Sequence, residues 1–250
     1  MNLKSIDIQP SSTIVIVAKR NEGKSVMAKF LLKSLVSTGR VDTVFLFSPT
    51  ENLSHSFDCV PKTHIVPTFN LKFIDSIIDA QSQACKKKGK DDPSVAKVLF
   101  IFDDMLGSVK QGSLEQQMLN RLFATSRHLK IGIMVLSQTS RGLFSPALRQ
   151  NTDYLLFRKI NDNQLPTMYE SMYFPGSYKE FLAFYHSATA ASQFGFLLYD
   201  NLTREDDKFF LLTAELCKFT IKYTNGLKTN SHSEKKTHSP TNPKYKPVKY

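Results

Sequence analysis

A short polar run after a β-branched stretch has the clearest chemical potential in this 250-residue chain. Residues 13–17 are all β-branched and mostly apolar, and a helix-forming segment follows the polar run. A loop between a strand and a helix points backbone N–H groups inward, and the helix dipole adds partial positive charge, so such a loop can cradle phosphate. Nine consecutive residues are expected to contact a nucleoside triphosphate: Ala18, Lys19, Arg20, Asn21, Glu22, Gly23, Lys24, Ser25 and Val26.

Four residues of this phosphate loop have distinct expected roles. Lys24 can neutralise the β and γ oxygens of ATP, and the Ser25 hydroxyl can bind the Mg²⁺ ion that bridges those oxygens. Gly23 lets the backbone approach the phosphates closely, whereas Ala18 stands where the pattern usually has its first glycine. A Gly-Lys-Ser triplet also begins ordinary helices by chance. The strand before the loop and the helix after it favour a site for ATP and Mg²⁺.

Two carboxylates are expected at the same edge of the protein. Asp103 and Asp104 directly follow the apolar run 98–102, and ligands of open α/β sheets bind where such strands end. We expect Asp103 to hold Mg²⁺, directly or through water, and Asp104 to orient and polarise the attacking water. The alternative is a simple turn after a core strand, and the phosphate loop makes this the weaker interpretation.

A third polar strand end follows the apolar run 131–136, where Ser137, Gln138 and Thr139 occur in succession. The amide of Gln138 can contact the γ-phosphate or hold the attacking water. A neutral amide suits a switch, because it can bond either to ATP or to a neighbouring segment without leaving a charge unpaired. The alternative is a polar residue that merely ends a strand.

Arginines flank this strand and supply candidates for a further catalytic role. An arginine from a neighbouring subunit would stabilise the charge that develops on the transferred phosphoryl group. Arg149 is the first candidate and Arg127 the second, with Arg141 nearby, while Arg20 could act within its own subunit. For each of them the alternative is a solvated or phosphate-steering residue.

The elements that must position these residues alternate between short apolar runs and helical patterns. Nearly continuous apolar runs are typical of strands covered on both faces, so we predict a mostly parallel sheet between two layers of helices. This is the α/β fold of a P-loop NTPase of the RecA-like, ASCE type. The predicted strands are 13–17, 44–47, 64–66, 98–102, 131–136, 154–157, 194–199 and 209–213. The predicted helices are 24–37, 70–85, 113–127, 164–173 and 177–189, with a charged surface loop at 86–92.

Composition excludes several classes of protein. With 41% hydrophobic and 22% charged residues the chain resembles ordinary globular proteins. No apolar run approaches the roughly 20 residues of a membrane span, and the N-terminus has no signal-peptide core, so we expect an intracellular protein without membrane contact. The three cysteines are far apart, which indicates neither a disulfide framework nor a zinc site.

Positive charge is concentrated at the C-terminus. Residues 221–250 hold seven lysines and one glutamate, a net of +6 out of the total of +11. This stretch has few aliphatic residues, so we divide the chain into an ATPase domain, 1–220, and a basic flexible tail, 221–250. Lysines interleaved with Tyr223, Tyr245 and Tyr250 could neutralise DNA phosphates without reading sequence. The alternative is a solubilising or targeting tail.

The order of three motifs resembles one family in particular. AKRNEGKS, then FIFDD, then TSRHLKIGIMVLSQTSRGLFSPALRQNTDYLLFR is similar to the genome-packaging ATPases of poxviruses, other large DNA viruses and virophages, within the FtsK and HerA superfamily. The resemblance covers about residues 13–157. It matches Lys24 and Ser25 to the family's nucleotide-binding loop, Asp103 and Asp104 to its acidic motif, and Gln138 to its polar sensor.

The resemblance implies a homo-oligomeric ring whose ATP hydrolysis pulls double-stranded DNA into a preformed capsid. It implies capsid or packaging-vertex proteins as partners, and a location at the cytoplasmic assembly site of an infected cell or in the virion. Two other functions stay open at this stage. One is an assembly ATPase of the filamentous-phage type, which exports DNA at a membrane, and the other is a nucleotide-dependent scaffold that has lost hydrolysis.

Overall fold

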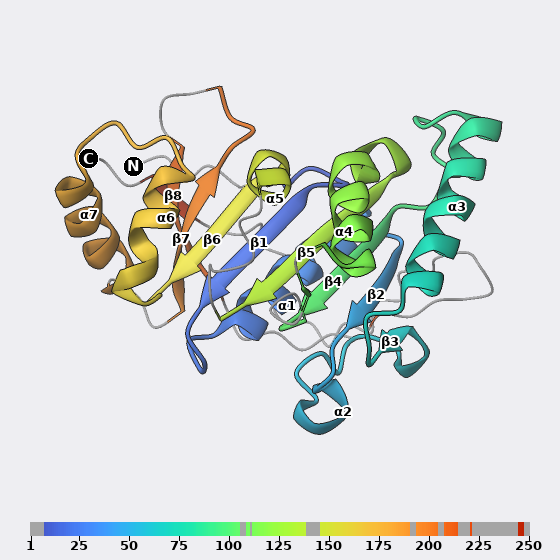
Figure 1. Cartoon of the computed structure of the whole chain (residues 1–250), viewed down its shortest axis with the longest axis horizontal. Helices are drawn as coiled ribbons and strands as arrows, with labels where there is room; N and C mark the ends of the chain where they lie inside the picture. Colours follow the sequence, from blue (N-terminus) through green and yellow to red (C-terminus); the bar gives the residue numbers. More distant parts are fainter. Residues whose placement is uncertain are drawn as a thin grey trace, which may run out of the picture.

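The computed structural model describes residues 8–105, 109–110, 112–138, 146–190, 194–204, 208–214, 221 and 245–247. Within these residues nine strands form one sheet in the order β3-β2-β4-β5-β1-β6-β7-β8-β9, and Figure 1 shows it nearly face-on. The strands are β1 (Thr13–Ala18), β2 (Thr43–Phe47), β3 (Ile65–Val66), β4 (Val98–Asp103), β5 (Ile131–Ser137), β6 (Tyr154–Arg158), β7 (Gly195–Asp200), β8 (Phe209–Thr213) and β9 (Tyr245–Pro247).

The first six strands are parallel, and the last three extend the sheet in antiparallel fashion. Strand β5 lies between β1 and β4, so the segments that follow these three strands emerge side by side at one edge. The register is in line there, because Val17 pairs with Ser137 and Asp103 pairs with Leu136. This arrangement confirms the predicted P-loop NTPase fold of the RecA-like, ASCE type.

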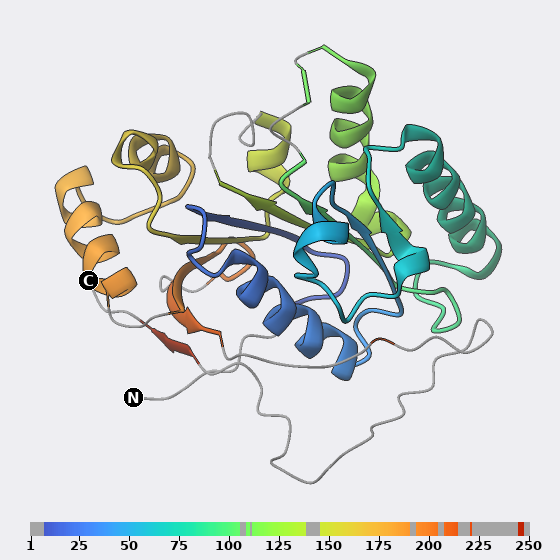
Figure 2. The ribbon, with the colours of Figure 1, turned by 90° about the horizontal axis from the view of Figure 1, so that it is seen from below.

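Helices cover both faces of the sheet, and the edge-on view of Figure 2 separates the two layers. Helix α1 (Lys24–Ser37) packs on one face, where Ile14 and Ile16 of β1 point. The opposite face, which Val15 and Val17 line, carries five helices. These are α3 (Leu71–Lys88), α4 (Leu114–Thr125), α5 (Pro146–Asn151), α6 (Leu165–Glu170) and α7 (Tyr178–Ala190).

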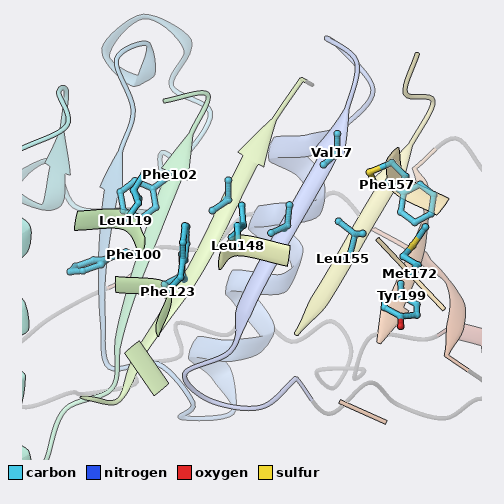
Figure 3. Close-up of a cluster of buried hydrophobic side chains, with 14 of the residues drawn as sticks. Val17, Phe100, Phe102, Leu119, Phe123, Leu148, Leu155, Phe157, Met172 and Tyr199 are labelled. Carbon is cyan, nitrogen blue, oxygen red and sulfur yellow. The ribbon is translucent and has the colours of Figure 1, made fainter. Parts of the chain in front are cut away.

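The larger core cluster lies between the sheet and these five helices. Figure 3 shows Phe100 and Phe102 of β4 beside Leu119 and Phe123 of α4. All six residues of β1 and the first five of β4 are buried. This confirms the prediction that the continuous apolar runs form strands covered by helices on both faces. Full burial of a phenylalanine side chain contributes about 1.5–3 kcal/mol, so β4 is held firmly under its helices.

Short elements complete the described chain, and most were not predicted. They are α2 (Glu51–Ser54) and the 3₁₀ turns η1 (Lys62–His64), η3 (Ser126–Leu129) and η4 (Asp162–Gln164). None of the described helices has both the length and the apolar character that crossing a bilayer requires.

Two expectations need correction. The predicted surface loop 86–92 begins too early, because α3 continues to Lys88 and ends at Gly89, whose φ of 90° suits glycine. Three lysines in the last turn of α3 complement the helix dipole, which favours the extension. In the basic tail, Tyr245–Pro247 forms β9 and pairs with β8, so these three residues belong to the sheet. The other residues after Ile221 lie outside the described part, and the domain boundary at 220 stays a prediction.

Candidate active site

The phosphate loop connects the end of β1 to the start of α1, as predicted. Asn21 and Gly23 both have left-handed backbone conformations, with φ of 63° and 83°. These two residues reverse the chain direction between the strand and the helix. Glycine and asparagine adopt this conformation at low cost. The Lys24 ammonium folds back over the loop and donates to the carbonyl oxygens of Ala18 at 2.8 Å and Lys19 at 2.9 Å.

The predicted carboxylates lie close enough to Lys24 for their charges to act on its ammonium. Burial lowers the pKa of the Lys24 ammonium, and the negative charges of Asp104, Asp103 and Glu22 oppose this shift. The loop and the acidic end of β4 therefore face one another at the same edge of the sheet. A separation of these segments to opposite sides of the molecule would have ended the case for a nucleotide site.

The two aspartates differ in environment although they are adjacent. Asp103 is half-buried at the end of β4, and the Ser48 hydroxyl donates to its Oδ2 at 3.3 Å. Burial raises the pKa of Asp103 to about 6 despite this hydrogen bond. Asp104 is exposed and has a left-handed backbone with φ of 54°, while its N–H donates to the Leu136 carbonyl at 3.0 Å.

Gln138 and Asp104 are in direct contact. The Gln138 amide Nε2 donates to Asp104 Oδ2 at 2.7 Å, so the end of β5 touches the end of β4. A residue expected to sense the γ-phosphate is thus bonded to the residue expected to orient water. Ser25 and Asp103 supply oxygen donors of the kind that Mg²⁺ prefers, so the residues at this edge fit an ATP-bound magnesium ion.

Comparison with known proteins decides the family. Residues 5–215 match the poxvirus A32 protein family. The chain belongs to the poxvirus A32 protein family. This membership confirms the resemblance to poxvirus proteins that was drawn from the motifs.

One individual relative of this A32-family chain shares little more than a quarter of its residues with it over the matched part. The uncharacterized protein 075L of invertebrate iridescent virus 6 is 28% identical over 163 residues, which cover 63% of this chain and 58% of that protein. The chain thus spans little more than half of that relative's length.

Two solved structures resemble this chain in fold. The genome packaging NTPase B204 of Sulfolobus turreted icosahedral virus 2, in complex with sulfate, is 15% identical with a TM-score of 0.57, over 85% of this chain and all of B204. The conjugation coupling protein TcpA of pCW3, solved with ATPγS, is 13% identical with a TM-score of 0.60, over 84% of this chain and 62% of TcpA. At these identities the likeness establishes the fold alone.

Arg127 of the A32-family chain does not lie at the nucleotide edge of its own subunit. Arg127 is in η3, before β5 begins, and its guanidinium pairs with Asp153 at 3.5 Å. Asp153 also accepts the N–H of Thr13, the first residue of β1, at 2.8 Å. Arg127 is therefore at the amino edge of the sheet, opposite Lys24. A catalytic role for it requires a neighbouring subunit.

Three other arginines were candidates: Arg149, Arg141 and Arg20. Arg149 lies in α5, which precedes β6, and its side chain is outside the described part. Arg141 and Thr139 are also outside the described residues, and Arg20 is exposed in the phosphate loop. The roles of Arg149, Arg127 and Arg20 stay predictions.

Sequence reasoning missed a group of polar residues at the end of β2. Ser48 contacts Asp103, and the Ser48 and Thr50 hydroxyls are 3.5 Å apart. Glu51 is buried and accepts the Phe57 N–H at 2.7 Å, and its charge helps to raise the pKa of Asp103. The signal was present, because these residues follow an apolar run just as Asp103 and Gln138 do.

Proposed function

We propose that this chain is an ATP-driven motor that translocates double-stranded DNA and packages a viral genome into a preformed capsid. The observation that carries the proposal is the convergence of Lys24, Asp103, Asp104 and Gln138 at one edge of a P-loop sheet in an A32-family chain. The genome packaging NTPase B204 has been solved with AMPPCP and with ATPγS, which supports nucleotide binding at such a fold.

ATP binding in this proposal changes the partners of Lys24. Its ammonium leaves the carbonyls of Ala18 and Lys19 and takes up the β and γ oxygens, while the N–H groups of the loop surround the phosphates. Ser25 and Asp103 would hold the Mg²⁺ that accompanies ATP, and that ion would neutralise charge on the phosphate oxygens.

Hydrolysis then depends on Asp104 and Gln138. Asp104 orients and polarises a water and takes up its proton, as the water oxygen bonds to the γ-phosphorus and the bond to the β–γ bridging oxygen breaks. Gln138, bonded to Asp104 here at 2.7 Å, can move between this carboxylate and the γ-phosphate without leaving a charge unpaired. The Asp104–Gln138 contact would therefore differ between the ATP-bound and the ADP-bound states, and this difference would reach the neighbouring strand ends.

Coupling to DNA is assigned to the assembled ring and to basic segments of the chain. The net charge of +11 favours a polyanionic partner, and the lysines after residue 221 can neutralise backbone phosphates without sequence preference. In the ring, an arginine from the next subunit completes each nucleotide site. Capsid or packaging-vertex proteins at the assembly site of the infected cell would anchor the motor.

The decisive experiment is ATP hydrolysis with and without double-stranded DNA, in wild type and Lys24→Ala. We expect DNA to stimulate wild-type turnover, and we expect Lys24→Ala to lose both basal and stimulated turnover. Absence of stimulation across DNA lengths and salt concentrations, with basal hydrolysis intact, would remove DNA translocation from the proposal.

A further inference from the structure

A glutamate within the phosphate loop is held from the side by the end of β6. Glu22 Oε2 accepts from Arg158 Nε at 3.1 Å and lies 3.3 Å from Lys159 Nζ. The Arg158 side chain is only 4% exposed, and that of Glu22 is 25% exposed. Desolvation raises the pKa of Glu22, but the hydrogen bonds from Arg158 and Lys159 outweigh it and hold this pKa below its usual value. The Glu22 carboxylate thus fixes the phosphate loop to the end of β6 through its charge.

The same arginine reaches two other elements. Its Nη1 donates to the Thr189 carbonyl near the end of α7 at 3.2 Å and to the Gly195 carbonyl at the start of β7 at 2.8 Å. Arg158 pairs with Ala18 across β6 and β1, which places it next to the loop. One buried guanidinium therefore joins the phosphate loop, α7 and β7, and its planar fork of donors suits three partners in fixed directions.

A second contact comes from the same segment of β7. Phe194, directly before Gly195, lies against the next loop residue, because a methyl group added to Gly23 would come within 2.9 Å of the Phe194 ring. Two successive loop residues, Glu22 and Gly23, are thus supported from one side. The residues before them, Lys19, Arg20 and Asn21, are exposed, so packing contributes little to the conformation of that part of the loop.

We propose that Arg158 is a positioning residue for nucleotide binding, which acts through Glu22 to hold the phosphate loop and links that loop to α7 and β7. This inference rests on the proposed binding of ATP at the loop. Arg158 also offsets the negative charge of Glu22, which would otherwise repel phosphates. If the loop adopts its binding conformation in only a fraction of the molecules, the apparent affinity for nucleotide is the intrinsic affinity multiplied by that fraction. Loss of Arg158 therefore weakens nucleotide binding more than it slows hydrolysis.

The test compares Arg158→Met, Arg158→Lys, Glu22→Ala and the double variant Glu22→Ala/Arg158→Met. For each, we measure kcat and KM for MgATP and the Kd of a non-hydrolysable ATP analogue. We expect Arg158→Met to raise KM and Kd by about tenfold, as loss of one charge-assisted hydrogen bond implies, with kcat within about threefold of wild type. Arg158→Lys should recover part of the affinity, because it retains the charge that pairs with Glu22.

The double variant separates positioning from general packing. If Arg158 acts through Glu22, Arg158→Met should change Kd less than about twofold in the Glu22→Ala background. Arg121→Met is the matched control, since Arg121 forms a carboxylate pair with Asp75 at 2.9 Å on the surface of α4, and it should leave Kd and KM unchanged.

Three outcomes overturn the inference. They are wild-type Kd in Arg158→Met, a fall in kcat with no change in Kd, or effects of the two substitutions that multiply. If Arg158→Met does not fold, Arg158→Lys in the wild-type and Glu22→Ala backgrounds decides by the same criterion of Kd. A wild-type protein that binds the analogue but does not hydrolyse ATP would contradict the proposed motor while leaving Arg158 testable by Kd.

Discussion

At the scale of single residues, the contact between Asp104 and Gln138 leads to a first prediction. Asp104→Asn keeps the size of the side chain and its hydrogen bond to Gln138, but it removes the charge that polarises water. We expect kcat to fall by about 100-fold or more, the usual contribution of a general base, with the Kd of a non-hydrolysable ATP analogue within about threefold of wild type. Steady-state hydrolysis and a direct binding assay measure the two quantities.

Glu115→Gln is a suitable control for that experiment, since Glu115 is an acid in the first turn of α4 and is not one of the predicted site residues. Turnover in wild type that is abolished by Asp104→Asn would exclude a scaffold that has lost hydrolysis. Turnover retained in the variant would show that another group activates the water, with Glu51 at the end of β2 the next candidate.

Asp103 leads to a second prediction, which concerns stability. Its pKa is 3.8 in the reference state and about 6 in the folded protein, because burial penalises its charge. The folded state therefore binds the proton more tightly between these values, and the free energy of unfolding falls as pH rises through about 6. The penalty at pH 7 is at most about 3 kcal/mol.

Asp103→Asn removes this penalty, so we expect a higher Tm than wild type at pH 7.5 and no difference near pH 4. Thermal unfolding without nucleotide or Mg²⁺ measures both. The same variant should lose Mg²⁺-dependent ATP binding, a cost in function for a gain in stability. A Tm below wild type at pH 7.5 would contradict the prediction, and Ser54→Ala near Glu51 provides an uncharged control.

The sequence located the residues whose chemistry follows from a strand end, and it missed those that depend on a neighbouring strand. Asp103, Asp104 and Gln138 were predicted because each follows an apolar run, and Lys24 because Gly-Lys-Ser stands between a strand and a helix. Arg158 was not, because its role comes from lying opposite Ala18 in the sheet. Nothing in the local pattern at 154–158 indicates that pairing.

At the scale of elements, the turn between β1 and α1 gives a third prediction, for Gly23→Ala. Gly23 has φ of 83°, which costs alanine about 1–2 kcal/mol, and the added methyl would meet the Phe194 ring at 2.9 Å. We expect the Kd of an ATP analogue to rise by about tenfold or more. Phe194→Ala in the same chain should relieve the collision but not the backbone cost, so it should restore only part of the affinity.

Gly89→Ala is the matched control. Gly89 also has a positive φ, 90°, at the end of α3, with no atom within 4 Å of the added methyl, so alanine there carries a backbone cost without a collision. It should lower Tm and leave nucleotide affinity unchanged. Equal effects of the two substitutions on Kd would mean that global destabilisation, not the shape of the phosphate loop, governs binding.

Element types were predictable where a segment is long and uniform, and less so where tertiary contacts decide. The runs that form β1, β4 and β5 are buried on both faces, and Ser113 caps α4 by accepting the Gln116 N–H. Short α2 and the antiparallel pairing of β7 and β8 were not predictable, because they depend on neighbours distant in sequence. The end of α3 was misplaced because three lysines look like a loop, although they suit the last turn of a helix.

At the scale of the whole molecule, the nucleotide edge and the amino edge of the sheet lie on opposite sides. Lys24 and Asp104 follow strand ends, whereas Arg127 precedes β5 and pairs with Asp153 beside the start of β1. Arg149 likewise precedes β6. In a ring of identical subunits that pack head to tail, the amino edge of one subunit can face the nucleotide edge of the next.

This geometry gives the fourth prediction, which is complementation between variants. We expect Arg149→Gln or Arg127→Gln to lower DNA-stimulated kcat by at least about 1,000-fold, the contribution of an arginine supplied from a neighbour. Mixed one to one with Lys24→Ala subunits, the responsible variant should regain turnover, because some interfaces then combine an intact Lys24 with an intact arginine. Random assembly gives such interfaces a frequency of about one half times one half, so turnover should approach one quarter of wild type if the sites act independently.

Arg121→Gln mixed with Lys24→Ala is the control, since Arg121 of α4 pairs with Asp75 of α3 and the variant should keep full activity by itself. Arg127→Gln also leaves Asp153 without an ion-pair partner that lowers its pKa, so its Tm must be measured beside its turnover. An arginine variant that is inactive, folded and not rescued by Lys24→Ala would place its function within its own subunit. For Arg127 that result would contradict its position at the edge opposite Lys24, and the head-to-tail ring would lose its structural basis.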